Sequence, residues 1–181
     1  MIDETEKKIL DAALKVFSQK GYDGAKTKAI AKESGFSEVT LFNRFKTKKD
    51  LYNMVAVQNI VKLNEDFDSM PKNYRCETPE AFLRTFIKDF AEIFYDNFEF
   101  LHLAIQEASK SHEQVEKEGI NILSEHLEKN IQNDKVDYQA LALTIFTFTY
   151  MYSLNKYKER TYIDLDTILE RFINTIIKCI Q

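Results

Sequence analysis

The chain is poor in residues that interrupt helices. It holds four glycines and two prolines among 181 residues, whereas average usage would give about 20 of the two together. So few breakers exclude collagen-like, proline-rich and turn-rich all-β architectures. The composition therefore predicts an all-α fold, with long helices joined by short connections.

Cysteine is also scarce, and no targeting segment is visible. Cys76 and Cys179 lie far apart and form no CxxC pair, so the chain lacks the pattern of a disulfide framework or of a zinc site. Residues 1–10 carry charges from Asp3 onward and contain no apolar signal-peptide core. These features predict a cytoplasmic protein.

The sequence further lacks the usual catalytic and metal-binding patterns. None of His102, His112 and His126 has a second histidine or a cysteine three or four residues away. Residues 112–116 (HEQVE) begin like a zinc-protease helix but lack its second histidine. No phosphate-binding glycine loop or nucleophile elbow occurs. We therefore expect no metal, no cofactor and no enzymatic activity.

One uncharged segment approaches the length of a membrane span. Residues 138–155 carry no formal charge across 18 positions, but six of these are polar. The charged residues on either side show no asymmetry that would orient a span. We expect a buried helix here and no membrane partner. An exposed interface helix and a lone span are the alternatives.

Charge divides the chain into two parts. Residues 1–52 hold 11 basic and 8 acidic side chains, a net charge of +3, and residues 53–181 hold 14 and 21, a net charge of −7. Within residues 26–49, seven cations face only Glu33 and Glu38. A basic segment on an acidic chain indicates a surface for a polyanion such as nucleic acid. A solvated lysine face is the alternative.

Local signals predict two short helices within this basic segment. The first helix of the chain is expected to end at Gly21. Thr27 is the expected N-cap of a helix over residues 27–34, and Ser37 that of a helix over 38–45. Gly35 supplies the left-handed turn between them. This spacing is that of a helix-turn-helix, whose second helix enters the major groove of DNA.

In the helix over residues 38–45, the expected packing buries one side and leaves the other exposed. The apolar residues Ile30, Ala31, Phe36, Leu41 and Phe45 are placed to pack on the first helix at Leu10, Leu14 and Phe17. Thr47 can open a long helix over residues 48–67 with a capping-box variant.

The same residues resemble a known family. Residues 27–31 (TKAIA), 34–37 (SGFS), 40–45 (TLFNRF) and 45–51 (FKTKKDL) resemble the DNA-binding signature of the TetR (tetracycline-repressor) family. Residues 9–13 with Phe17 and Gly21 match as well. The resemblance covers residues 7–52, whereas residues 53–181 agree only in length and helical character.

The resemblance implies a homodimeric repressor that a small molecule releases from a palindromic double-stranded DNA operator, and the phenylalanine pattern over residues 82–98 favours an apolar or aromatic ligand. It implies an N-terminal three-helix helix-turn-helix domain over residues 1–50, with the motif at about 27–45. A larger helical ligand-binding and dimerisation domain would occupy residues 51–181, and the helix over 48–67 would link the two. The alternative is a helical small-molecule or lipid-binding protein, or an enzyme, with a vestigial DNA-binding unit. Such a protein would not need the basic segment.

By position, the resemblance also implies the DNA contacts. The expected contact residues are Thr27, Lys28, Ser37, Glu38, Val39, Thr40, Phe42, Asn43, Arg44 and Lys48. Glu38 could accept a hydrogen bond from cytosine N4, and Val39 could pack on a thymine methyl group. Alternatively, both residues only shape the helix surface. Phe42 stands where the family usually has Tyr, and the absence of that hydroxyl removes a phosphate hydrogen bond of about 1 kcal/mol.

Two further residue sets are expected in the C-terminal region. Phenylalanines recur every four residues from Phe82 to Phe98 and wrap around their helix, which indicates core packing or, alternatively, a ligand cavity. The candidate pocket residues are Phe86, Phe90, Phe94, His102, Phe148 and Tyr152. The candidate dimer residues, on helices over 138–155 and 164–180, are Leu141, Ile145, Leu165, Ile168, Phe172 and Ile176. The intrachain core is the alternative for this second set.

Overall fold

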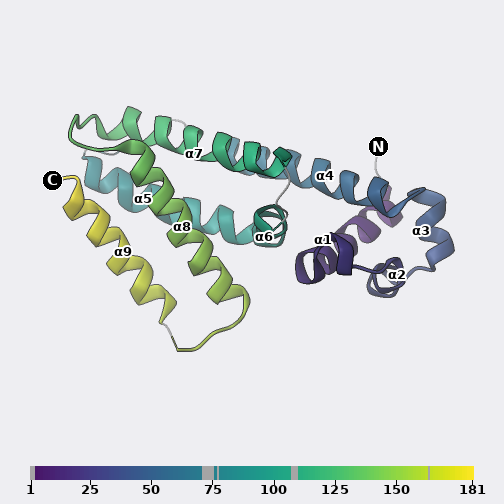
Figure 1. Cartoon of the computed structure of the whole chain (residues 1–181). Helices are drawn as coiled ribbons and strands as arrows, with labels where there is room; N and C mark the ends of the chain where they lie inside the picture. Colours follow the sequence, from purple (N-terminus) through teal and green to yellow (C-terminus); the bar gives the residue numbers. More distant parts are fainter. Residues whose placement is uncertain (1–2, 71–75, 77, 107–109, 163) are drawn as a thin grey trace. The chain divides into compact units, whose positions relative to one another are not determined.

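The computed structural model describes residues 3–70, 76, 78–106, 110–162 and 164–181, and residues 110–116 and 118 only by their backbone. Throughout these ranges the regular elements are α-helices, which confirms the predicted all-α class (Figure 1). The helices are α1 (Glu4–Gly24), α2 (Thr27–Ser34), α3 (Glu38–Arg44), α4 (Lys48–Ser69), α5 (Pro79–Asp96), α6 (Phe98–Gln106), α7 (Lys110–Ile131), α8 (Tyr138–Tyr157) and α9 (Leu165–Cys179).

The chain forms two compact units. The N-terminal unit comprises Met1–Asp66 with Glu99–His112, and the C-terminal unit comprises Phe67–Phe98 with Glu113–Gln181. The first unit thus includes a segment from the middle of the sequence. The predicted domain boundary lies between residues 50 and 51, whereas the first compact unit continues to Asp66. The boundary at residue 50 concerns functional domains and stays a prediction.

A single apolar core holds the N-terminal unit together. Its buried residues are Ile9, Leu10, Ala13, Val16, Phe17, Ala25, Ile30, Ala31, Leu41, Phe45, Leu51, Val55 and Leu103. Phe36 and Leu14 pack against them while partly exposed. The inward packing predicted for the second and third helices is therefore confirmed. Removing so many apolar side chains from water is the main stabilising contribution to a unit of this size.

Two helix ends differ from those predicted, at the end of α1 and at the start of α2. Gly21 has a φ of 67° and interrupts α1, as predicted, but the chain resumes helical turns and α1 ends only at Gly24. The N-cap of α2 is Lys26, which makes no side-chain cap, and Thr27 is the first residue of the helix. The Thr27 hydroxyl instead donates to Glu38, on α3. The expected capping role of Thr27 was therefore wrong.

The turn between α2 and α3 requires glycine. Gly35 has a φ of 78°, and its N–H donates to the carbonyls of Ala31 and Lys32 at the end of α2. A Cβ in this left-handed conformation is disfavoured. The predicted turn at Gly35 is confirmed.

Substituting Gly35 by alanine is expected to lower the free energy of unfolding by about 1–2 kcal/mol, because alanine would retain the left-handed φ. The matched control is Gly119→Ala in α7, where an added Cβ meets no atom within 4 Å. This control should raise stability by about 0.5–1 kcal/mol, because alanine is the better helix former. Urea unfolding followed by circular dichroism measures both changes. Shifts in the same direction would contradict the backbone argument.

In the C-terminal unit, α5 packs against α8 and α9 (Figure 1). Phe82, Phe86, Phe90 and Phe94 of α5 are all buried, and consecutive rings contact each other with centroids 5.3–6.1 Å apart. The Arg84 guanidinium on α5 lies 2.8 Å from the Glu170 carboxylate on α9. Burial of these rings, rather than that exposed ion pair, supplies most of the stability.

The uncharged segment forms α8, which is buried on one side only. Ala142, Ile145 and Thr149 are buried, whereas Leu143 and Met151 are about half exposed. Among the described residues, every helix falls short of the combined length and apolarity that crossing a membrane would require.

His126 of α7 is half-buried beside aromatic rings, 5.0 Å from the Phe86 ring and 5.9 Å from the Phe82 ring between centroids. Burial lowers the pKa of His126 below its ordinary 6.5, and the nearby Lys129 cation lowers it further. The folded chain therefore favours the neutral imidazole.

Stability is expected to fall as pH decreases below about 6.5, because the unfolded chain then binds a proton that folded His126 does not. The decrease can reach at most about 1.4 kcal/mol per pH unit for one group. It is complete once pH has passed below the lowered pKa of the folded chain. Urea unfolding between pH 7.5 and 5 measures this dependence. A His126→Gln variant should lose that part of the slope, and an unchanged slope would contradict the assignment.

Candidate nucleic-acid interface

Helix α3 is a short helix fixed by its first turn and by one buried side chain. Ser37 Oγ accepts a hydrogen bond from the Thr40 N–H at 3.1 Å, which confirms Ser37 as the predicted N-cap. Leu41 is fully buried, so it anchors the helix to the core. Val39 is 69% exposed and Phe42 43% exposed. These exposed apolar side chains need another partner or remain in water.

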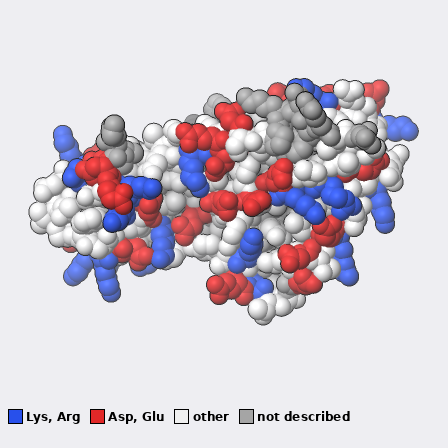
Figure 2. Space-filling model, turned by 180° about the vertical axis from the view of Figure 1, so that it is seen from behind, with Lys and Arg blue, Asp and Glu red and all other residues white. Residues whose placement is uncertain are grey.

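Exposed cations precede and follow this helix in the sequence. Lys28 is exposed in the first turn of α2, and Lys46 and Lys49 are exposed beyond α3. Figure 2 shows Lys and Arg side chains projecting from this unit, with acidic side chains among them. Glu33 is exposed within residues 26–49 as well, so the exposed cations of this segment are accompanied by an acid.

Lys48, at the start of α4, rests on uncharged groups. Its Nζ lies 4.5 Å from the centroid of the Tyr22 ring and 3.5 Å from the Asp23 carbonyl oxygen. Tyr22 is in turn held by an edge-to-face contact with Tyr52, with centroids 5.0 Å apart. The cation is therefore held in place without being neutralised.

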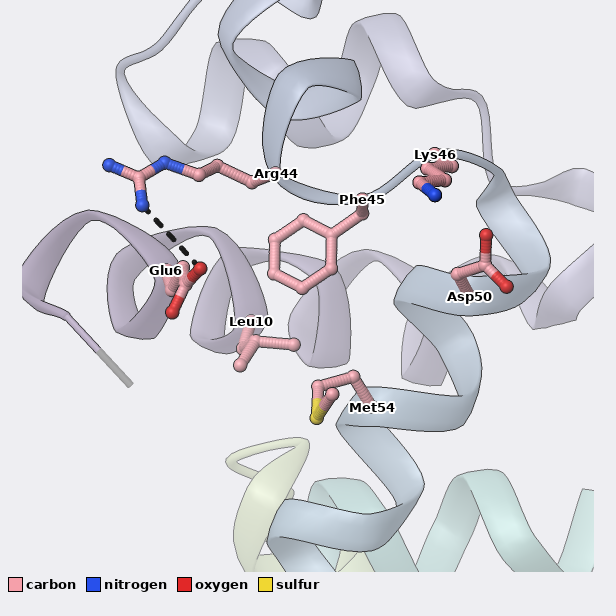
Figure 3. A pocket seen from close by; sticks show the side chains of 7 residues that line it. All are labelled: Glu6, Leu10, Arg44, Phe45, Lys46, Asp50 and Met54. Atoms are coloured by element: carbon pink, nitrogen blue, oxygen red, sulfur yellow. Dashed lines mark hydrogen bonds and ion pairs between the residues drawn. The ribbon is translucent and has the colours of Figure 1, made fainter. Parts of the chain in front are cut away.

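Arg44, at the end of α3, contacts two carboxylates of α1. Its Nη1 lies 2.5 Å from Asp3 Oδ2 and 3.5 Å from Glu6 Oε1, and Figure 3 shows Arg44 reaching toward Glu6. Asp3 and Glu6 also form the capping box of α1. The Glu6 N–H that donates to Asp3, followed by the Arg44 cation, lowers the pKa of Asp3. Neither acid was expected at the site from the sequence, although their Asp-x-x-Glu spacing signals a cap.

A hollow of about 340 Å³ lies beside Arg44. The side chains that line it are Glu6, Leu10, Arg44, Phe45, Lys46, Asp50 and Met54. The Phe45 ring faces Leu10 and Met54, while Lys46 and Asp50 lie on the other side (Figure 3). Its cations and acids balance, so it offers no strong preference for an ion of either sign.

Two of the expected contact residues are joined to each other. The Thr27 hydroxyl donates to Glu38 Oε1 at 2.7 Å, in partly buried surroundings. The bond links the first turn of α2 to the first turn of α3. Glu38 and Thr40 are half-buried, whereas Asn43 and Arg44 are exposed. The ten expected residues therefore differ in how freely they can reach a ligand.

The expected pocket residues belong to more than one arrangement. Phe86, Phe90 and Phe94 line up along α5 inside the C-terminal unit. Phe148 of α8 stacks instead on Phe172 of α9, with centroids 3.7 Å apart and nearly parallel rings. The ring centroid of Tyr152, one turn further along α8, lies 6.3 Å from that of Phe148.

His102 does not share a compact unit with the other expected pocket residues. It lies on α6 within the N-terminal unit, whereas the remaining five belong to the C-terminal unit. Its Nε2 contacts Gln106 Nε2 at 2.8 Å. The aromatic group around Phe86 contains His126 instead, a residue that the sequence pattern raised only as a metal ligand.

Half of the expected dimer residues are buried within the single chain. Leu141, Ile145 and Ile176 are at most 8% exposed, which fits the intrachain core that the sequence left as the alternative. Leu165, Ile168 and Phe172 are half-buried on α9. Periodicity identified these residues as apolar, but it did not distinguish a partner chain from the neighbouring helix.

The family comparison matches residues within the N-terminal unit. The family model described as bacterial regulatory proteins, tetR family, matches residues 9–55. The biofilm operon icaADBC HTH-type negative transcriptional regulator IcaR of Staphylococcus aureus is 33% identical over 91 residues, which are 47% of this chain and 47% of IcaR. The chain therefore aligns with about half the length of this curated relative.

Solved structures extend the likeness in fold to nearly the whole chain. A TetR-like transcriptional regulator from Rhodococcus sp. RHA1 has a TM-score of 0.72 at 18% identity, covering 96% of this chain and 94% of that one. The transcriptional regulator FadR from Bacillus subtilis, in complex with stearoyl-CoA, has a TM-score of 0.61 at 19% identity, covering 94% and 96%. At such identities these structures support the fold, with its N-terminal helix-turn-helix and larger helical C-terminal region.

Proposed function

Since residues 9–55 make this chain a member of the TetR family, we propose that it is a transcriptional regulator that binds duplex DNA through α3. The observation that carries this proposal is the geometry of α3. Leu41 anchors the helix on its buried side, while Val39, Asn43 and Arg44 remain exposed. A helix presented in this way can enter the major groove, which admits one helix.

The proposed DNA contacts follow the expected residues, with roles that their surroundings refine. Lys48 and Lys28 would bind phosphates, which positions the protein without selecting bases. Ser37 and Thr40 share a 3.0 Å contact between their hydroxyls at the start of α3, where they could also reach the backbone. Arg44 would exchange its carboxylate partners for phosphate.

Phe42 offers a test of the backbone contacts. Phe42→Tyr adds a hydroxyl at an exposed position and is expected to tighten binding about fivefold, the effect of one hydrogen bond of about 1 kcal/mol. Because a phosphate contact carries no sequence information, the increase should be equal on specific and nonspecific duplexes. Fluorescence anisotropy with both duplexes measures it. An increase on the specific duplex alone would indicate a base contact instead.

We further propose a homodimeric repressor released from a palindromic operator by a small, apolar or aromatic ligand. The resemblance to a negative regulator, IcaR, supports repression, and the stearoyl-CoA bound to the fold relative FadR supports an apolar ligand. Partly exposed Leu165, Ile168 and Phe172 of α9 leave apolar surface for a second copy. Sedimentation at micromolar concentration should give twice the chain mass, and a monomer would contradict the dimer.

The experiment that tests the proposed function is selection from a random-sequence duplex pool by the full chain. We expect an enriched duplex with two related half-sites one helical turn apart. Its binding should weaken linearly in a plot of log affinity against log salt concentration. Failure to enrich any duplex over repeated rounds would contradict the proposal.

A further inference from the structure

The hydrogen bond between Thr27 and Glu38 limits how these two residues can contact DNA. A threonine hydroxyl has one proton to donate, and an ionised carboxylate can only accept. At 2.7 Å between Thr27 Oγ1 and Glu38 Oε1, that proton is directed at the carboxylate. Thr27 therefore cannot donate to a phosphate at the same time, and Glu38 is held toward α2.

An ionised carboxylate has about four acceptor sites, so Glu38 could accept a second hydrogen bond while it keeps the one from Thr27. The Thr27 bond nevertheless holds the carboxylate toward α2, and moving it to cytosine N4 would bring it among phosphates of its own sign. Glu38 is therefore better suited to hold α3 against α2 than to contact a base.

The exposed residues next to Glu38 have a different chemistry. Val39 is 69% exposed, and its apolar side chain can contact the thymine methyl group, the apolar feature of the major groove. Asn43 is exposed one turn later, on the same side of the helix as Val39. An asparagine amide matches the N6 and N7 edge of adenine.

Resting on the proposed function, we infer that Glu38 is a positioning residue acting through Thr27, and that Val39 and Asn43 read the bases. The chain accordingly selects thymine at the position facing Val39 and adenine at the position facing Asn43. Cytosine is not selected through Glu38.

The first experiment replaces thymine by uracil, one position at a time, in the duplex that the full chain selects. This change removes only the 5-methyl group. We expect one thymine in each half-site whose replacement weakens wild-type binding about fourfold, the effect of one buried methyl group. The Val39→Ala variant should be insensitive to the same replacement. Equal weakening in both proteins, or no sensitive thymine, would overturn the assignment of Val39.

The second experiment tests Glu38 and Thr27 by repeating the selection with variants. Glu38→Gln keeps an acceptor for the Thr27 hydroxyl and should bind like the wild type. Glu38→Ala and Thr27→Val should each weaken binding to all duplexes by a similar factor, with the double variant no weaker than either. The preferred bases should stay unchanged. A preference for cytosine that disappears in Glu38→Ala would overturn the inference while leaving the proposed function intact, whereas no selection by the wild type would overturn both.

Discussion

Replacing Leu41 by alanine is expected to lower the free energy of unfolding of the N-terminal unit by about 2–5 kcal/mol and to abolish DNA binding. Leu41 is fully buried among side chains of the N-terminal core. The seven-residue α3 is too short to be stable without its packing. Truncating this anchor therefore removes both the stability and the fixed orientation of the helix. Urea unfolding and anisotropy with the selected duplex measure the two effects.

The matched control is Phe42→Ala, at the neighbouring position of the same helix. Phe42 is 43% exposed, so the substitution leaves a smaller cavity and should lower stability by less than about 1.5 kcal/mol. A decrease in Phe42→Ala as large as that in Leu41→Ala would contradict the anchoring role. So would a Leu41→Ala protein that binds the duplex like the wild type.

The Lys48→Ala substitution is expected to weaken DNA binding about 10- to 100-fold on every duplex, the effect of losing a hydrogen bond from a charged group. The slope of log affinity against log salt should flatten by about one for each phosphate that the protein no longer neutralises. Arg44→Ala should weaken binding less, because Asp3 and Glu6 already compensate the Arg44 charge, whereas Lys48 rests on the neutral Tyr22 ring. Anisotropy between 50 and about 300 mM salt measures both the affinity and the slope.

Lys135→Ala serves as the charge-matched control. Lys135 is exposed between α7 and α8, outside the proposed interface, and its removal should leave affinity and slope unchanged. An unaltered slope in Lys48→Ala would exclude a phosphate contact. Weaker binding by Arg44→Ala than by Lys48→Ala would show that the acids of α1 do not compete with DNA.

The helix ends could be predicted wherever their causes are local. Ser37 accepts a hydrogen bond from an N–H three residues away, and the N–H of Gly35 donates to the last turn of the preceding helix. Both roles can therefore be predicted from a few neighbouring residues. Thr27 could have formed a local capping bond, but its hydroxyl bonds instead to a carboxylate 11 residues away. Tertiary packing determines this partner, and the local sequence does not specify it.

The same distinction applies to the candidate site. Residue types predicted a basic surface with α3 at its centre, and the family match covers those positions. The partners of Arg44 lie 38 and 41 residues away in sequence, at Glu6 and Asp3. Such pairs depend on how α1 and α3 are brought together, which periodicity does not encode. Likewise, periodicity marked Ile145 as apolar without telling that it is buried inside its own chain.

A crystal structure of the full chain bound to the duplex that it selects would show directly how α3 contacts DNA. We expect α3 in the major groove, Val39 against a thymine methyl group, and Lys48 on a phosphate. The Thr27–Glu38 hydrogen bond should persist in the complex. DNA bound to another surface of the chain, or α3 lying outside the groove, would contradict the proposal that this helix reads DNA.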